Sequence, residues 1–158
     1  MDTSGLNEFA RILLERIVDE FPEWLDDATL EKSDGNFLLV FMPGFKSKTG
    51  EDRRLSVSTG TGPDKVIFNF AGWDAVVNAE KDRYGASYLD SMMLEDETGT
   101  MNPDIEESIL MLGHILNEKL VVSVNPDKVT FPVKENMKIL EVLRSWNGSY
   151  DRIVYDVE

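Results

Sequence analysis

The sequence contains no cysteine and only one histidine, His114. Without cysteine, the chain has no disulfide, no thiolate nucleophile and no structural zinc of the usual kind. No apolar run approaches the ~20 residues that span a bilayer. The N-terminus, Met1–Gly5, also lacks the basic and apolar regions of a signal peptide. A cytoplasmic protein with no membrane partner is therefore expected.

Glycine motifs that bind phosphate are also missing. The segment Gly60-Thr61-Gly62-Pro63-Asp64-Lys65 lacks the spacing and the Gly-Lys-Ser/Thr ending of a phosphate-binding loop. It lies between two expected antiparallel strands and opens no helix, so it is not a dinucleotide-binding fingerprint. We expect a turn there and no cofactor.

Basic residues are scarce, with 16 Lys and Arg against 30 Asp and Glu, and the net charge is −14. Residues 1–35 hold ten acids and three bases (−7), and residues 74–107 hold ten acids and two bases (−8). Such a surface repels nucleic acid and lipid phosphates and attracts a basic partner. Solubility is the alternative explanation of the charge.

The chain has enough residues to fold around one core. Its 158 residues are 42% hydrophobic, and nothing in the composition marks a linker or an internal repeat. We expect one domain over residues 1–158.

The first half predicts one helix followed by strands. Apolar residues three to four apart favour an amphipathic helix from about Gly5 to Glu20, with Ser4 as N-cap and Pro22 as its stop. An acidic connector, Glu23–Asp34, follows. Three strands joined by short connections predict an antiparallel meander, and they are Phe37–Met42, Leu55–Thr59 and Lys65–Phe70. Lys46–Arg54 reads as a polar loop, and Ala71–Val77 continues past the last strand.

The second half predicts another helix and a closing hairpin. Asn102-Pro103-Asp104 opens the helix with a cap, a proline and an acid, whereas residues 78–101 give no clear pattern. Strands are expected at Leu120–Val124 and Val129–Val133. Residues 136–146 fit either a helix, through Ile139, Leu140 and Leu143, or a strand face with Leu140, Val142 and Trp146.

The stretch Ser145-Trp146-Asn147-Gly148-Ser149-Tyr150-Asp151 favours the strand. Asn-Gly between β-prone flanks is the usual centre of a type I′ turn, which would place Trp146 opposite Ser149. The fold class predicted is α+β, with an antiparallel sheet of about six strands packed by two main helices.

Few residues suggest catalysis. His114 falls on the polar side of the second helix, near Glu107 and Glu118, where it could act as a general base or a proton sensor. No nucleophile or metal-ligand pattern accompanies it, so a surface histidine is the simpler interpretation. A small acidic hydrolase that uses Asp74, His114 or paired carboxylates remains an alternative.

Clustered acids and three aromatic residues are the candidates for binding a partner. Asp26-Asp27 and Glu95-Asp96-Glu97 lack the spacing of a calcium loop, so we expect solvated charge or a partner-facing patch and no metal site. The aromatic residues Trp73, Trp146 and Tyr150 either pack in the core or anchor an interface.

The order of these features resembles an immunity-protein family of bacterial polymorphic-toxin and contact-dependent growth inhibition systems. The resemblance covers Val66–Phe70 running into Gly-Trp-Asp-Ala, the helix end Ile115–Val121, and Ser145–Asp151. Asp74 and Val76 stand where histidines occur in the family, so no role of those histidines carries over to this chain.

The resemblance implies a non-enzymatic protein that binds and neutralises a cognate toxin. Residues 74–107 would then form its acidic face, and the toxin, for example a nuclease, would be basic. A general protein-interaction adaptor is a further alternative, and the oligomeric state is open. The candidate partner-binding residues are Trp73, Asp74, Asp90, Glu95, Asp96, Glu97, Tyr150 and Asp151.

Overall fold

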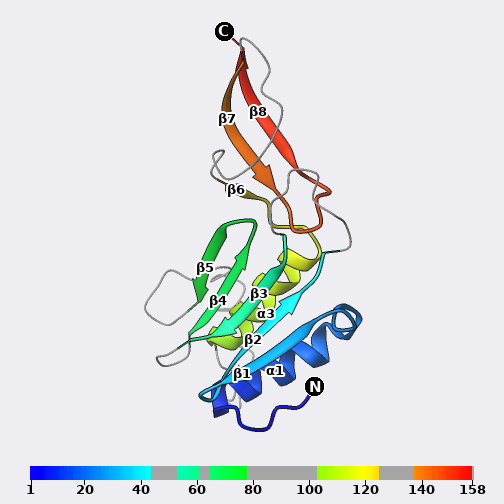
Figure 1. Ribbon diagram of the computed structural model, residues 1–158, viewed down its shortest axis with the longest axis vertical. Coiled ribbons are helices and arrows are strands. Elements are labelled where there is room, and N and C mark those ends of the chain that lie inside the picture. Colours follow the sequence, from blue (N-terminus) through cyan, green and yellow to red (C-terminus); the bar gives the residue numbers. More distant parts are fainter. Residues whose placement is uncertain (44–52, 61–64, 78–102, 125–136, 158) are drawn as a thin grey trace.

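The computed structural model describes residues 1–43, 53–60, 65–77, 103–124 and 137–157 (Figure 1). Two longer helices and eight strands in two antiparallel sheets make up this part of the chain, which confirms the α+β class. Several expectations lie outside the described residues. They are most of the polar loop at residues 46–54, the unassigned segment 78–101, the strand at 129–133, and the side chains of Asp90, Glu95, Asp96 and Glu97.

Helix α1 spans Glu8–Glu20 and begins three residues later than predicted. Its N-cap is Asn7, whose side chain accepts a hydrogen bond of 2.8 Å from the backbone N–H of Ala10. Ser4, the predicted cap, instead donates to the carboxylate of Asp2. An Asn side chain is as good a cap as Ser, so the local sequence alone does not choose between them. The helix ends at Glu20, and its C-cap, Phe21, directly precedes Pro22.

The predicted acidic connector contains a strand. After the 3₁₀ turn Pro22–Trp24, strand β1 (Thr29–Ser33) pairs with β2 at the edge of the larger sheet. Four of its five residues are exposed. Only Leu30 of this strand packs against the core, so the strand shows no alternation of apolar and polar residues that the sequence could reveal.

The larger sheet has the order β1-β2-β3-β4-β5, and all its pairs are antiparallel. The predicted meander is confirmed as β2 (Asn36–Phe41), β3 (Leu55–Thr59) and β4 (Val66–Phe70). Ala71–Val77 does not continue past the last strand. Instead, the chain reverses, and β5 (Trp73–Val77) pairs back onto β4.

Two hairpins of this sheet have tight turns with both central residues at positive φ, as a type I′ turn requires. Asp34 and Gly35 have φ of 51° and 80° between β1 and β2. Ala71 and Gly72 have φ of 53° and 79° between β4 and β5. Short turns of this kind bring sequential strands directly together.

The type I′ turn predicted at Asn147-Gly148 is wrong. Only Gly148 has a positive φ, and its N–H donates to the carbonyl of Ser145 at 3.2 Å. The register pairs Leu143 with Arg152, so Trp146 does not lie opposite Ser149 in a two-residue hairpin. A seven-residue loop, 145–151, joins the two strands, and tertiary contacts described below hold it.

The second half begins with helix α3 (Pro103–Leu116), close to where the sequence predicts it. The smaller sheet has the order β6-β7-β8, with strands Val122–Val124, Met137–Arg144 and Arg152–Val157. The ambiguous segment at 136–146 is therefore a strand and not a helix. In Figure 1, β7 and β8 extend away from the larger sheet.

A register shift in β7 turns Leu140 outwards. Ile139 pairs with Tyr155 and Glu141 with Val154, which leaves Leu140 as the extra residue of a bulge. Leu140 is 56% exposed, whereas Val142 is fully buried and Ile139 packs against the core. Leu140 therefore does not share the face of Val142 and Trp146 that a regular strand would give.

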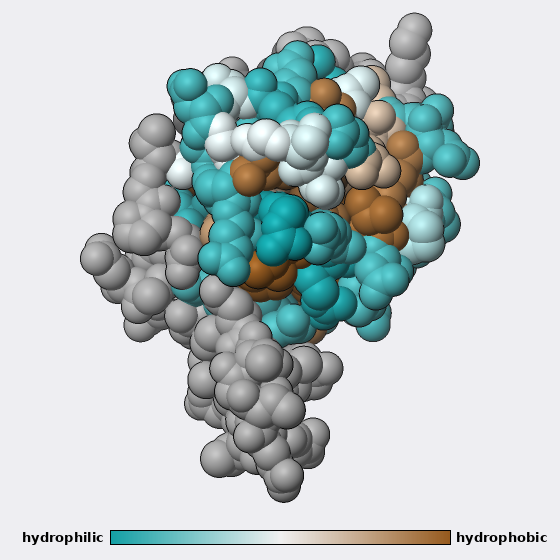
Figure 2. Space-filling model, turned by 90° about the horizontal axis from the view of Figure 1, so that it is seen from below, coloured by the Kyte–Doolittle hydropathy of each residue, from teal (hydrophilic) through white to brown (hydrophobic). Residues whose placement is uncertain are grey.

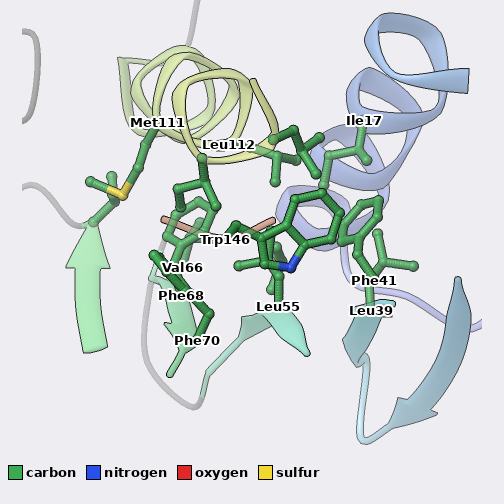
Figure 3. Packing of buried hydrophobic residues seen from close by; sticks show 14 of the residues in the cluster. Ile17, Leu39, Phe41, Leu55, Val66, Phe68, Phe70, Met111, Leu112 and Trp146 are labelled. Atoms are coloured by element: carbon green, nitrogen blue, oxygen red, sulfur yellow. The ribbon is translucent and has the colours of Figure 1, made fainter. Parts of the chain in front are cut away.

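The core lies between the two helices and one face of the larger sheet (Figure 3). Trp146, from the loop 145–151, reaches into this core and lies between Ile17 of α1, Leu112 of α3 and the sheet residues below. It is fully buried, and its ring meets that of Trp24 edge-on at 5.3 Å. The loop is thereby fixed to the main body.

We expect Gly→Ala to have opposite effects on stability at two glycines, Gly35 and Gly113. A Cβ added at either Gly35 or Gly113 would lie 3.5 Å from its nearest neighbour, which is an ordinary contact. Gly35 has φ of 80°, so Gly35→Ala should lower the free energy of unfolding by about 1 kcal/mol. Gly113 lies inside α3, so Gly113→Ala should raise it by about 1 kcal/mol. Urea unfolding of both variants measures this, and a shift of equal sign would contradict it.

Candidate functional site

Loop 145–151 exposes one aromatic side chain while its backbone is tied to the body. Trp146 is fully buried, and Tyr150, four residues later, is 60% exposed. The N–H of Tyr150 donates to Ser145 Oγ at 3.0 Å, which closes the loop on itself. The sequence predicted Tyr150 as an exposed contact residue, but not this support.

Glu118, at the end of α3, holds one side of the loop. Its Oε1 accepts hydrogen bonds from Ser145 Oγ at 2.8 Å and from the N–H of Ser149 at 3.0 Å. Burial by itself would raise the pKa of Glu118, but hydrogen bonds from Ser149, Ser145 and Asn147 outweigh it and lower the pKa. Glu118 is therefore a carboxylate at neutral pH, as an acceptor of these bonds should be.

Arg53 holds the other side of the loop from a position just before β3. Its side chain is only 2% exposed, and its two terminal nitrogens reach the carboxylate of Asp151 at 3.2 and 2.5 Å. The first of them also donates to the carbonyl of Ser145 at 2.8 Å. Asp151 accepts a further bond of 3.2 Å from the N–H of Ser145. Asp151, a predicted partner-binding residue, thus uses its carboxylate to bind Arg53 and Ser145 of its own chain.

The remaining predicted contact residues lie on β5 or outside the described part. Trp73 is half-buried and packs edge-on against Phe70 at 5.5 Å. Asp74 is exposed, and its carboxylate accepts a hydrogen bond from Asn69. Trp73 and Asp74 belong to the larger sheet and Tyr150 and Asp151 to the loop of the smaller one. Asp90, Glu95, Asp96 and Glu97 are not among the described residues.

Part of the predicted acidic face at residues 74–107 is buried. Asp104 and Glu107 are 4% and 1% exposed on α3. Glu106 binds Arg16 of α1, with the closest nitrogen and oxygen 2.9 Å apart. Among the described acids of that stretch, only Asp74 is exposed. The acidic first turns of α3 therefore pack against the rest of the protein. The number of charges in the sequence does not predict which of them are buried.

The acidic surface of the described chain lies instead on residues 1–35, which we call the N-terminal acidic surface. All ten of its acids are exposed, and they are Asp2, Glu8, Glu15, Asp19, Glu20, Glu23, Asp26, Asp27, Glu31 and Asp34. Its three bases each already pair with an acid. The pairs are Arg11–Glu15, Arg16–Glu20 and Lys32–Asp2, at 3.1, 2.7 and 3.3 Å. Figure 2 shows this lower end of the molecule, where hydrophilic residues cover most of the described surface.

His114 lines a cleft of about 310 Å³ between α1 and α3. The cleft is lined by Phe21 and Gly113 and by the paired Arg16 and Glu106. Asp74, the predicted catalytic companion of His114, is not among the lining residues. His114 is half-buried and not freely exposed as the sequence suggested, and burial followed by the nearby Lys119 lowers its pKa.

The lowered pKa of His114 predicts a loss of stability in mild acid. The unfolded chain takes up a proton at the ordinary pKa of 6.5, while the folded chain takes it up only at lower pH. The contribution is therefore fully present above pH 6.5 and declines as the pH falls below it. His114→Gln should have a flatter dependence of its thermal midpoint between pH 7.5 and 5.5 than the wild type. Parallel curves for the two proteins would contradict the assignment.

Comparison with known proteins gives no relative for this chain: no family model, no curated protein and no solved structure matches it. Within the described ranges, no helix is long and apolar enough to cross a membrane. The same residues contain no group of three or more histidines and acids placed to hold a metal ion.

Sequence reasoning missed Arg53 and Glu118, the two side chains that fix the loop. Arg53 belonged to a polar stretch and Glu118 to a helix end, and neither carries a local motif. Their partners are distant along the chain, since Arg53 binds Asp151 and Glu118 binds Ser145. Only the tertiary structure brings such pairs together.

Proposed function

We propose that this chain is an immunity protein that binds a cognate bacterial toxin in the cytoplasm and neutralises it without catalysis. The resemblance carried by Val66–Ala75, Ile115–Val121 and Ser145–Asp151 suggests this class. The partner expected is a basic toxin domain such as a nuclease, because nucleases carry cationic clefts for phosphate.

The observation that carries the proposal is the N-terminal acidic surface. Its ten acids are exposed, and its three bases are already paired with acids of the chain. Seven negative charges therefore remain over 35 residues for interaction with a basic partner. Electrostatic steering by such a surface speeds association and weakens as salt is added.

The first experiment is co-purification with the C-terminal domain of a secreted protein encoded directly upstream. We expect a stable complex whose association rate falls as the salt concentration rises. Protection of cells that express the toxin domain is the matching functional readout. Absence of a complex with that domain, together with absence of protection, would rule the proposal out.

Two triple variants distinguish the acidic surfaces. Glu23→Gln with Asp26→Asn and Asp27→Asn acts on the N-terminal acidic surface, and Glu95→Gln with Asp96→Asn and Glu97→Gln acts on the other acidic stretch. Both change the net charge from −14 to −11, so long-range attraction falls equally. The variant that loses more affinity identifies the surface in contact, and surface substitutions of this kind rarely change stability by more than about 0.5 kcal/mol. If both variants bound with the affinity of the wild type, and if that affinity did not depend on salt concentration, the electrostatic part of the proposed function would be wrong.

A small acidic hydrolase has one observation in its favour, the cleft in which His114 lies with Glu20 and Glu106. A half-buried histidine with a lowered pKa near carboxylates can act as a general base. Protection of cells by His114→Gln at the wild-type level would argue against this alternative. Loss of protection with a retained complex would favour it.

A further inference from the structure

We propose that Tyr150 is the anchor of the toxin interface, presented on a loop that is rigid before binding, and that it receives a cationic side chain of the partner. This inference rests on the proposed function and names the contact through which it acts. The loop consists of residues 145–151, between β7 and β8.

The first step is the exposure of Tyr150. At 60% it is the most exposed large hydrophobic residue of the described chain, although aromatic side chains gain free energy when they are buried. The other aromatic of the same loop, Trp146, is fully buried. Two aromatic residues four positions apart thus point to opposite environments, one holding the loop and one facing solvent.

The second step is the fixation of the backbone on both sides of Tyr150. Ser149 donates its N–H to Glu118, and Tyr150 donates its own to Ser145 Oγ, both at 3.0 Å. Asp151 donates its N–H to the carbonyl of Gly148 at 3.3 Å, and its carboxylate is held by the buried guanidinium of Arg53. Three consecutive residues of a surface loop therefore have a fixed main chain.

A loop that is fixed before binding has an advantage in affinity. A loop that must become ordered loses part of its interaction free energy, whereas a preformed loop keeps it. Tyrosine adds a large contact area for only two rotatable side-chain bonds, and it is enriched among the residues that dominate interfaces. A fixed loop that presents an exposed tyrosine has the properties of an interface anchor.

The charge of the chain indicates which partner side chain Tyr150 would contact. The chain carries a net charge of −14, so a partner drawn to it presents Lys and Arg. The face of a tyrosine ring attracts such a cation, and Arg in particular stacks on it. Exposed Val121 lies at the same end of the smaller sheet, because the next residue, Val122, pairs with Arg144 directly before the loop.

The experiment compares Tyr150→Ala with Leu140→Ala by calorimetry against the upstream-encoded toxin domain. The two side chains are 60% and 56% exposed, so neither truncation should alter the fold. We expect Tyr150→Ala to weaken binding by about 30-fold, as for a hot-spot residue, and Leu140→Ala by less than about 3-fold. Tyr150→Phe keeps the ring and should stay close to the wild type. Equal effects of the two alanine variants would overturn the anchor.

A second pair of variants tests the rigidity of the loop. Glu118→Gln loses the charge but keeps an acceptor oxygen, whereas Glu118→Gly loses the charge and the acceptor. Glycine also suits the φ of 55° at this position, so the helix end is preserved. We expect Glu118→Gly to bind at least about 5-fold more weakly than Glu118→Gln while both remain folded by circular dichroism. Equal affinity of this pair would overturn the preformed loop.

The two levels of the proposal fail in different ways. If the wild type binds and Tyr150→Ala binds equally well, the anchor is wrong and the immunity function stands. If the wild type does not bind the toxin domain, the proposed function fails and this inference fails with it.

Discussion

Replacing Arg53 with methionine is expected to lower the free energy of unfolding by about 2–3 kcal/mol, the usual contribution of hydrogen bonds from a buried charged group. The Asp151 side chain is 28% exposed and keeps Arg144 at 3.9 Å, so it is not left as an unpaired buried charge. The substitution keeps most of the side-chain length but removes both nitrogens that reach Asp151 and the one that reaches the carbonyl of Ser145. The Ser145 carbonyl and the Asp151 carboxylate would then lose a charged donor. Urea unfolding followed by tryptophan fluorescence measures the change.

Arg11→Met is the matched control for this experiment. Arg11 also pairs with a carboxylate, Glu15, at 3.1 Å, but the two side chains are 43% and 50% exposed. Exposed helix pairs contribute only about 0.3–0.5 kcal/mol, so this variant should unfold almost as the wild type does. A loss below about 1 kcal/mol for Arg53→Met would show that the ion pair does not hold the loop to the body.

Truncation of Trp146 to alanine should have a larger effect, about 3–5 kcal/mol. The side chain is fully buried between the two helices and the larger sheet, and the edge-on contact with Trp24 would be lost (Figure 3). The cavity would open at the point where the loop meets the core. Thermal unfolding and the near-ultraviolet circular dichroism of the aromatic residues should both report the loss.

Trp146→Phe separates the packing of the ring from the hydrogen bonding of its indole. Within the described part of the chain, Nε1 of Trp146 is buried and finds no acceptor, so phenylalanine sacrifices no bond there. We expect a cost of about 1–2 kcal/mol, well below that of alanine, because most of the apolar ring is retained. Equal losses for the two variants would contradict the assignment of Trp146 to the core.

Elements with a clear apolar period could be predicted from the sequence. Helices α1 and α3 and strands β2, β3 and β4 each place one face in the core, and the period of that face is written in the chain. Strand β1 was not predicted because only one of its residues, Leu30, packs against the core, and one residue gives no apolar period. The shift at Leu140 escaped because a bulge breaks the alternation on which the prediction depends.

The sequence could name candidate residues for the site but could not show which of them are exposed or lie together. The sequence identified Tyr150 as a possible contact residue but placed the acidic face on residues 74–107, where Asp104 and Glu107 are buried. Charge counts say how many carboxylates a stretch carries and not which way its helix faces. The acids of residues 1–35 became the stronger candidate for the acidic surface only when the structure showed that they are exposed.

The sequence by itself determined the α+β class, the positions of the main helices and the negative charge, because these depend on local periodicity and composition. The tertiary structure alone decided the conformation of Ser145–Asp151. The local Asn-Gly preference for a type I′ turn is outweighed there by burial of Trp146 and by bonds to Arg53 and Glu118. Those partners lie 98 and 27 residues from the loop residues they hold, a separation that no local pattern encodes.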